Sequence, residues 1–527
     1  MTALHRGSIA LTNARIHTLD QSNAVAQAIS IVDGRIRAVG SESEVSPFIG
    51  EDARIVDVSG RTVLPGFIDA HTHIELGAYA GGLWVNVRDK TPEETIEVVA
   101  AEVLKRPGEW VIAQGTFGQV LPSRADLDTV APSTPVLVRE SMHILQANST
   151  ALRLAGIGHT TMPNAASRLE RDARGEPTGK VEEGFDLFPV PYPDEHKLIS
   201  LLQEEVTKSF VQHGVTTAHE LPATAAAVRA WQTLAGRGEL PLRLSLNFTV
   251  APGHQPLLRS VADLTRLGLR TGFGGESLKV GALKMFLDGD EAAAFTGRQL
   301  QGAPRSWGLV THTYTQLLHI LSESFEAGVQ VWIHCIGDAA QEMALDAIEA
   351  VAHLYPDYDH RTRLEHISCE CSDWDQVDRM LSAGIIPVPT AAFMYALTDP
   401  EEELSYFIYR SLLGAGHKPP GNSDSAGSQP FATNPWFSIS CLLNRRNKLG
   451  REVSPDERID LESALRIHTV NGAYAAFEEK EKGTLEVGKL GDLVVVDEDP
   501  FGMDPEAIAD VRTTMTVVGG TVVYEQP

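Results

Sequence analysis

Hydrophobic and polar positions alternate over short runs at both ends of the chain, a pattern typical of β-strands. Near the N-terminus two such runs flank Asp33-Gly34, and near the C-terminus two flank Gly519-Gly520, so each pair predicts a β-hairpin. Neither end is long enough to bury a core alone. We therefore expect residues 1–64 and 476–527 to form one composite β-sandwich, with two independent edge ribbons as the alternative.

Between these ends, short apolar runs alternate with long helical stretches, which predicts repeated β-α units. An eighth strand is expected just before Ser423-Asp424, in addition to seven candidates. The fold class predicted for residues 65–475 is therefore an α/β protein of the TIM type, a (β/α)8 barrel. The seven candidate strands are residues 66–70, 214–218, 242–246, 283–287, 329–333, 362–365 and 385–388.

The interval between the first and second candidate strands is far longer than a β-α connection requires. We expect residues 79–212 to carry an inserted, lid-like subdomain with its own helices and strands. Insertions that follow a barrel strand rise from the C-terminal face of the barrel, where active sites lie, so this one is expected to cover the pocket.

Composition narrows the class of protein. The 527 residues are 43% hydrophobic and 22% charged, as in a soluble globular enzyme. The formal net charge of −26 disfavours nucleic acid and anionic membranes as partners. Four cysteines do not make a disulfide framework, and the Cys369/Cys371 pair has no second pair to complete a zinc knuckle. We find no signal-peptide pattern or transmembrane run, and so expect a cytoplasmic enzyme.

Histidines follow the candidate strands at their carboxyl ends. His71 and His73 lie two apart on the first strand and therefore face the same way, whereas an isolated pair of this kind is more often a coincidence. His334 and His366 each end another candidate strand. Because these ends converge at one rim of a barrel, the four histidines predict a metal site. Imidazole ligands suit zinc, with nickel, iron or manganese as alternatives.

Two further side chains fit such a centre. Asp424 would end the eighth strand, where a carboxylate can touch the metal, take a proton from its water and pass it to a leaving nitrogen; the alternative is an Asx-turn residue. Lys284 lies inside an apolar strand. It either pairs with Asp288 or, with a lowered pKa, adds carbon dioxide to become a carbamate that bridges two metal ions.

Taken together, these motifs closely resemble the amidohydrolase superfamily, and within it amidohydrolase family 3, the branch that includes N-substituted formamide deformylases. The similarity runs nearly from end to end, and the set of motifs is specific although no single member is. The matching stretches are residues 64–73, 123–128, 148–152, 284–289, 334–338, 365–366, 423–424, 468–473 and 488–493.

The resemblance implies a metal-dependent hydrolase that cleaves a carbon–nitrogen bond of a small molecule, with one or two divalent ions and a possible homodimer. It assigns the histidines and Asp424 named above to the centre, and implies a carboxylated Lys284. His143 matches a family histidine that reaches the substrate, and His219 is either a second pocket residue or structural.

Three departures from the family pattern lie where substrate is gripped. Ser141-Met142 stands in place of Asp-Gly, Val388-Pro389-Thr390 in place of Gln-Pro, and Asp290 in place of a small residue. The family's substrate therefore does not carry over. An amide, N-formyl or N-acyl compound is expected, and the alternatives are an N-acyl amino acid deacylase, a cyclic-amide hydrolase or a non-catalytic scaffold that has lost its activity.

Other candidates for the pocket come from the insertion and the late loops. Arg139 and Arg445 are candidates for binding a substrate carboxylate, although each is more often structural. A true arginine clamp would favour the N-acyl amino acid deacylase. The apolar candidates, each more often plain core, are Trp84, Phe117, Trp307, Phe393, Met394 and Trp436.

Overall fold

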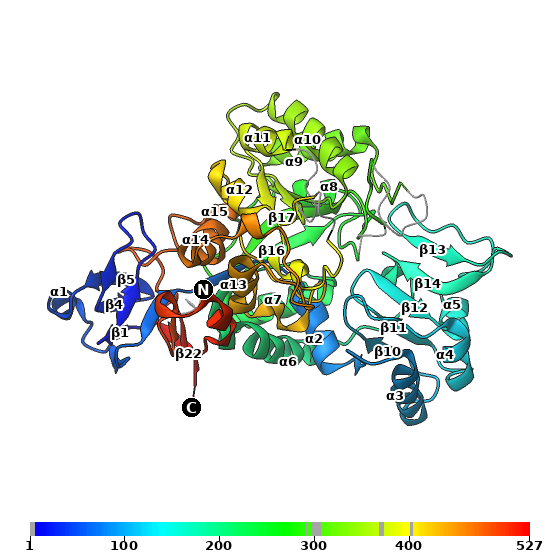
Figure 1. Cartoon of the computed structure of the whole chain (residues 1–527), viewed down its shortest axis with the longest axis horizontal. Coiled ribbons are helices and arrows are strands. Elements are labelled where there is room, and N and C mark those ends of the chain that lie inside the picture. The colour runs from blue at the N-terminus through cyan, green and yellow to red at the C-terminus, as the bar shows by residue number, and fades with distance from the viewer. Residues whose placement is uncertain are drawn as a thin grey trace.

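A computed structural model describes residues 6–253, 255–290, 293–297, 307–367, 374–400 and 404–526. A parallel sheet with its helices occupies the centre (Figure 1). The sheets built from the two chain ends lie on one side of it, and a separate sheet of residues 85–182 lies on the opposite side. Cys369 and Cys371 lie outside the described residues.

The central sheet is a curled parallel sheet of seven strands, as in TIM-like α/β folds, and the seven candidate strands are present in it. Its order is β20-β19-β18-β17-β16-β15-β8, and each neighbouring pair is parallel. Every strand of this sheet except β8 and β20 at its edges has a neighbouring strand on each side. Parallel sheets of this kind are buried on both faces, which favours apolar runs in their strands. The strands are β8 (Phe67–Thr72), β15 (Val215–Glu220), β16 (Arg243–Thr249), β17 (Leu278–Phe286), β18 (Val331–His334), β19 (Arg363–Glu365) and β20 (Ile386–Val388).

Helices pack around this sheet, and their ends carry the expected signals. Thr313 and Gln316 form a capping box at the start of α9 (Tyr314–Ala327), which ends at Gly328 in the left-handed conformation. Within the described ranges, no helix is both long and apolar enough to cross a membrane. The other helices of this central region are α2 (Ile74–Gly82), α6 (Glu195–Glu205), α7 (Ala225–Arg237), α8 (Ala262–Thr265), α10 (Asp338–Ala352), α11 (Asp375–Ser382), α12 (Tyr409–Gly414), α13 (Pro435–Asn444), α14 (Leu461–Arg466) and α15 (Gly472–Ala475).

The expected eighth strand is not formed: the described residues before Ser423 are irregular. This segment nevertheless lies between the two edge strands. The carbonyl of Gly421 accepts the Ala70 N–H at 3.0 Å, and the side chain of Asn422 donates to the Pro389 carbonyl at 2.9 Å. Two prolines precede Gly421 and supply no N–H groups, so a regular ladder cannot form there.

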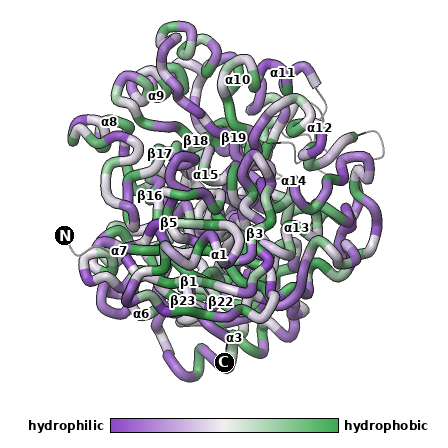
Figure 2. The backbone as a smooth tube through the Cα atoms, turned by 90° about the vertical axis from the view of Figure 1, so that its left-hand side faces the viewer, coloured by the Kyte–Doolittle hydropathy of each residue, from purple (hydrophilic) through white to green (hydrophobic). Residues whose placement is uncertain are grey.

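The chain ends share one sheet. Strand β7 (Thr62–Pro65) pairs antiparallel with β21 (Leu493–Val496) in the six-stranded order β23-β22-β21-β7-β2-β3. A second sheet, β5-β4-β1-β6, packs against it through buried residues from both ends of the chain, and these strands are largely hydrophobic (Figure 2). The remaining strands are β1 (Ile9–Thr12), β2 (Arg15–His17), β3 (Val25–Ala26), β4 (Ala28–Val32), β5 (Arg35–Gly40), β6 (Arg54–Asp57), β22 (Thr513–Val518) and β23 (Thr521–Glu525), with α1 (Glu42–Val45) after β5.

The segment between β8 and β15 contains a sheet of its own, in the order β13-β14-β12-β11-β10-β9. The two ends of the expected range 79–212 do not belong to this inserted sheet. They lie on α2 and α6, which pack against each other and share the core of the central region. The elements of the inserted sheet are β9 (Val85–Asn86), α3 (Pro92–Lys105), β10 (Val111–Gln114), α4 (Arg124–Val130), β11 (Val136–Arg139), β12 (Ile144–Ala147), α5 (Ser149–Leu154), β13 (Arg168–Arg171) and β14 (Pro177–Glu182).

A buried ion pair joins the central sheet to the sheet of the chain ends. Arg243 of β16 binds both oxygens of Asp492, at 2.7 and 2.9 Å, and both side chains are nearly inaccessible.

Arg243→Met would leave the Asp492 carboxylate buried without its counter-ion, so we expect the free energy of unfolding to fall by about 3–5 kcal/mol. Urea unfolding measures this. Arg54→Met, which removes an exposed pair with Glu525, should cost less than about 1 kcal/mol; equal losses would contradict the prediction.

Candidate metal centre

Four buried histidines meet at the carboxyl ends of three strands, the edge strand β8 and the neighbouring strands β18 and β19. His71 is the penultimate residue of β8 and His73 directly follows that strand, whereas His334 ends β18 and His366 follows β19. The ring centroid of His71 lies 5.4 Å from that of His73 and 4.9 Å from that of His366, which is 5.1 Å from that of His334. The structure therefore brings together all four histidines that the sequence singled out.

Asp424 faces the same cluster. Its Oδ1 lies 3.3 Å from Nε2 of His73 and 3.6 Å from Nε2 of His71. One ligand atom each from His71, His366 and Asp424 lie within 4.8 Å of one another. The Asp424 backbone has a positive φ of 45°, and its N–H donates to the His71 carbonyl at 2.9 Å, which turns the carboxylate toward the histidines.

The chemistry of this donor set fits a divalent metal. Nε2 of His71, both ring nitrogens of His334 and Oδ1 of Asp424 are buried without a hydrogen-bond partner. Such atoms are costly in a folded protein unless something binds them. Burial lowers the pKa of His71, His334 and His366 well below the usual histidine value, so these rings are neutral, the form that coordinates metal.

A layer of side chains behind the cluster orients it. Oε2 of Glu365 lies 2.6 Å from Nδ1 of His71, which leaves Nε2 of that ring facing the centre. Arg363 binds both oxygens of Glu365, at 2.7 and 3.0 Å, and its guanidinium lies 3.5 Å from the ring centroid of Trp332. On the other side, Nδ1 of His366 is 2.9 Å from the Thr390 hydroxyl.

Sequence reasoning missed Arg363 and Glu365. The signal available was their spacing: two residues apart on a strand, they point to one face, and that strand ends in a candidate ligand. A carboxylate adjacent in sequence to a metal-binding histidine is itself a sign of an outer-shell partner. Thr390 carried no comparable signal, because its contact with His366 arises only when β20 lies beside β19.

Lys284 of β17 lies inside the barrel beside the cluster. Its side chain is buried, with Nζ 4.8 Å from the ring centroid of Phe286, and that ring lies 4.9 Å from the ring of His334. Burial lowers the pKa of Lys284 to about 8, although the carboxylates of Glu365 and Asp424 act in the opposite direction. Asp288, the alternative partner, instead accepts N–H groups of the backbone at Ile336, Gly337 and Phe295.

His143 reaches the cluster from the inserted sheet, just before β12. Its ring centroid is 6.1 Å from that of His334, and its Nδ1 is 2.8 Å from Oε1 of Glu183. Burial alone would lower the pKa of His143, but the carboxylates of Glu183 and Asp290 raise it to about 10. The inserted segment therefore supplies a protonated imidazole at the edge of the centre.

His219 lies one layer deeper than the cluster. It is fully buried, and its ring contacts Trp332, at 6.0 Å between centroids, and the guanidinium of Arg363, at 3.5 Å from Nδ1. Trp332 and Arg363 stand two residues before His334 and Glu365 on their strands, which places them in the layer below. The expected pocket role of His219 is thus not supported by its position, and its contacts are structural.

The apolar candidates fall into three groups. Phe117 and Phe393 stack in parallel with 6.5 Å between centroids, and Phe393 in turn stacks on His366 at 5.4 Å. Met394 and Trp436 are buried and pack in the main core. The Trp307 side chain is 71% exposed. A pocket role for these three residues stays a prediction.

Arg139 and Arg445 hold the fold together rather than face a pocket. The Arg139 guanidinium lies between the rings of Trp84 and Phe185, 4.5 Å from each centroid, and Nε donates to the Ser141 carbonyl. This also explains why Trp84 is not free to contact a ligand. Arg445 donates to four backbone carbonyls, at residues 406, 407, 453 and 454. Nη1 of Arg139 is buried without a hydrogen-bond partner, so its role in binding a carboxylate stays a prediction.

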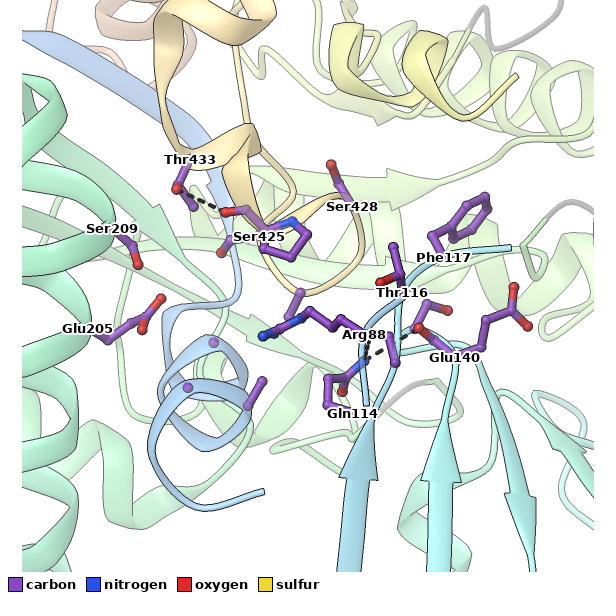
Figure 3. A pocket seen from close by; sticks show the side chains of 17 residues that line it. Arg88, Gln114, Thr116, Phe117, Glu140, Glu205, Ser209, Ser425, Ser428 and Thr433 are labelled. Carbon is purple, nitrogen blue, oxygen red and sulfur yellow. Dashed lines mark hydrogen bonds between the residues drawn. The ribbon is translucent and has the colours of Figure 1, made fainter. Parts of the chain in front are cut away.

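A small cavity of about 160 Å³ adjoins the centre, between the inserted sheet and α2 and α6. Figure 3 shows Arg88 extending into it, with Glu205 on the opposite wall and Phe117 and Glu140 on the side of the inserted strands. Neither Arg88 nor Glu205 was singled out from the sequence, because nothing in their local pattern distinguishes them from surface charges.

Comparisons with known proteins agree with this geometry. The sequence pattern of the Amidohydrolase family matches residues 54–524. N-substituted formamide deformylase from Arthrobacter pascens is 30% identical over 98% of both chains, and Protein LONG AFTER FAR-RED 3 from Arabidopsis thaliana is 29% identical over 98% of this chain and 91% of that one. The crystal structure of an uncharacterized metal-dependent hydrolase from Pyrococcus horikoshii superposes with a TM-score of 0.74 at 21% identity, covering 95% of this chain and 99% of the other.

A curled parallel sheet of the TIM-like α/β class carries a buried histidine and aspartate cluster that could hold a metal ion at its carboxyl edge. The chain belongs to the amidohydrolase family, and it is a hydrolase that acts on carbon–nitrogen bonds. The resemblance noted from the motifs is thereby confirmed.

The His143–Glu183 pair predicts a pH-dependent stability in the metal-free protein. The pKa of His143 is about 10 in the folded protein against 6.5 for the free side chain. The stabilisation is therefore complete below pH 6.5 and is lost as the pH rises through 10; at 1.36 kcal/mol per pKa unit it is roughly 5 kcal/mol at most. Glu183→Gln should weaken this dependence, while the carboxylates of Asp290 and Asp424 still raise the pKa of His143.

Thermal unfolding of chelator-treated protein between pH 6 and 10 checks it. The difference in melting temperature between wild type and Glu183→Gln should be largest near pH 6 and shrink toward pH 10. Glu176→Gln is the matched control, because the His159–Glu176 pair is exposed. A difference that stays constant across this range would refute the assigned protonation of His143.

Proposed function

We propose that this enzyme hydrolyses the amide bond of a small N-formyl or N-acyl compound with a water molecule activated at the histidine cluster. The observation that carries the proposal is the convergence of four buried histidines and Asp424 with partnerless ligand atoms. The similarity to a formamide deformylase over the whole chain supports the bond type. The departures at Ser141-Met142 and Asp290 favour a different substrate.

The ligands we assign to the metal are His71, His73, His334, His366 and Asp424, with zinc as the first choice. When bound, such an ion lowers the pKa of water toward neutrality and polarises a carbonyl oxygen. The Arg363–Glu365 pair keeps the proton of His71 on Nδ1, so that Nε2 of His71 stays available as a ligand.

Asp424 moves the proton in this mechanism. Although burial alone would raise it, the pKa of Asp424 lies below its usual value because the rings of His73 and His71 face its carboxylate. The side chain therefore enters the reaction as a carboxylate. It accepts a proton from the attacking water and delivers it to the leaving nitrogen, a general base and then a general acid role.

His143 is placed to stabilise the oxygen of the substrate carbonyl. Its ring is anchored by Glu183 through Nδ1, and its centroid lies 6.1 Å from that of His334, which puts this histidine beside the centre. A donor held before the reaction at the position where negative charge develops stabilises the transition state without reorganisation. We assign this role to His143 and none to His219.

Lys284 we propose to carry a carbamate. The neutral amine attacks carbon dioxide, a nitrogen–carbon bond forms, and one proton is released to solvent, which leaves a carboxylate on Nζ. The position supports this, because an ammonium group buried beside neutral histidine rings lacks an ion pair among the described residues, whereas a carbamate would bring two oxygens to the centre. Such a group favours two metal ions over one.

The domain organisation is part of the proposal. We infer that residues 65–475 form the catalytic barrel and that 1–64 with 476–527 form one supporting unit, in line with the mixed sheet of the chain ends. Within the barrel, the inserted segment contributes His143 and one wall of the cavity beside the centre.

Asp424→Asn should lower kcat by about 10²–10⁴ on any amide that the wild type cleaves, because the variant cannot take up the proton of water. Metal content by plasma emission and amine release, measured on the same samples, check this. Asp399→Asn is the control, since that carboxylate is 88% exposed. Full activity in Asp424→Asn would refute the assigned role, and a wild type without stoichiometric metal that cleaves nothing would favour the non-catalytic scaffold.

Reconstitution with metal and ¹³C-bicarbonate should give a carbamate ¹³C signal in the wild type that is absent in Lys284→Met. The variant should also bind less metal, because it would lack the two carbamate oxygens. Lys105→Met, at an exposed lysine on α3, should match the wild type in both measurements. A metal-replete wild type without the signal would show that Lys284 acts as a plain amine.

A further inference from the structure

The cavity beside the centre contains two opposite charges that face it without pairing. Arg88 follows β9 on the side of the inserted sheet, and Glu205 ends α6 on the side of the barrel. Both line the cavity, and in Figure 3 the Arg88 guanidinium points across it toward Glu205. Among the described residues, Arg88 has no ion pair within 4.0 Å. Burial lowers the pKa of Arg88, and the charges of Glu205 and Asp89 act in the opposite direction without a hydrogen bond.

The carboxylate of Glu205 is held in place by the shape of α2. A Cβ at Gly77 would lie 2.9 Å from Oε1 of Glu205, and one at Gly81 would lie 3.3 Å from Oε2. Glycine at both positions therefore leaves room for the carboxylate against that helix. Glu140, the other acid of the cavity, is already engaged, since it accepts the Gly118 N–H at 2.6 Å. The charges that face each other across the cavity are thus Arg88 and Glu205, whose carboxylate also accepts a hydrogen bond from Ser209.

Three residues of the cavity wall connect it to the histidine cluster, each through a single contact or one intervening side chain. The Ser425 hydroxyl accepts the His73 N–H at 3.0 Å, and the Ser141 hydroxyl accepts the His143 N–H at 3.1 Å. Phe117, also in the wall, stacks on Phe393, which stacks on His366. A substrate with its amide at the cluster would therefore bring the rest of the molecule toward Arg88 and Glu205.

The size and lining of the cavity restrict what can fit. At about 160 Å³ it is smaller than the roughly 300–1,000 Å³ of a pocket for a drug-sized ligand, so it takes one end of a substrate. Glycine, alanine, serine and threonine make up most of its wall, so its charges come from Arg88, Glu140 and Glu205. A purely anionic group would also meet Glu205 and an acidic protein of net charge −26.

We propose that this cavity binds the α-amino acid head group of the substrate, with its carboxylate on Arg88 and its ammonium on Glu205. The substrate class is then an amide several bonds away from such a head group, as in an ω-N-acyl diamino acid. This rests on the proposed function, because it names the substrate of the same site. A zwitterion satisfies both charges at once and brings no net charge into the protein.

Binding of three probes with six-carbon chains tests the head group without any reaction. Calorimetry on the metal-loaded enzyme compares norleucine, which has both charges, with hexanoate and hexylamine, which have one each. Norleucine should bind at least about tenfold more tightly than either, and Arg88→Met and Glu205→Gln should each weaken it by about tenfold or more, as expected for loss of a charge-assisted hydrogen bond. Arg174→Met, at an exposed arginine, should bind norleucine like the wild type.

Each other outcome overturns the proposal. Norleucine binding that is unchanged in both variants, with melting temperatures equal to the wild type, would show that the two charges do not contact a ligand. Hexanoate binding as tightly as norleucine, with loss only in Arg88→Met, would replace the zwitterion by a plain carboxylate subsite.

Hydrolysis separates this result from the proposed function. Nε-acetyl-lysine, 6-acetamidohexanoate, N-acetylcadaverine and N-butylacetamide share the scissile bond and differ in charge. Cleavage of all four at similar kcat/KM would support the amide hydrolase and overturn the head-group site. Norleucine binding that depends on Arg88, with no cleavage of any of the four, would support the head-group site and contradict the proposed reaction on these amides.

Discussion

The hydrogen bond between His71 and Glu365 connects the fold to the chemistry. His71 lies on β8, one edge of the curled sheet, and Glu365 lies on β19, next to the other edge, so this 2.6 Å contact spans the gap where an eighth strand is absent. Arg363 reinforces it by donating to Glu365 and, across the same gap, to the Ala70 carbonyl at 2.9 Å. The interactions that draw the sheet into a barrel are therefore also those that orient a metal ligand.

Such a closure is energetically demanding, because Arg363 and Glu365 are fully buried ions. The cost is offset by complete pairing: the guanidinium meets two carboxylate oxygens, a carbonyl and the face of Trp332. Removing one member would leave an unpaired buried charge and a misplaced His71 together. This coupling explains why the centre can hold several partnerless ligand atoms: the rigidity comes from the layer beneath, and the cluster itself is left free to bind.

The sequence predicted the parts of the molecule that depend on local pattern. Most of the seven barrel strands are short apolar runs, and the four histidines lie at strand ends, so convergence at one rim follows from topology alone. The prediction of an eighth strand was wrong, because a segment can lie between the two edge strands of the sheet without a ladder of backbone hydrogen bonds. The prolines before Gly421 prevent such a ladder, and side-chain contacts such as that of Asn422 replace it. Met394, Trp436 and Arg139 were assigned to the pocket by residue type, but packing within the core determines where they lie.

The position of Arg88 opposite Glu205 could not be predicted from the sequence. Each comes from a different part of the chain, one beside the inserted sheet and one on a barrel helix, and their relation exists only after the two are packed together. The same holds for His143, which becomes a cation because Glu183, distant along the chain, lies 2.8 Å away. The histidine cluster is determined by the barrel and the bond chemistry follows from it, whereas the charges that select a substrate arise where the insertion meets the barrel. Substrate preference can therefore change through the insertion while the centre stays intact.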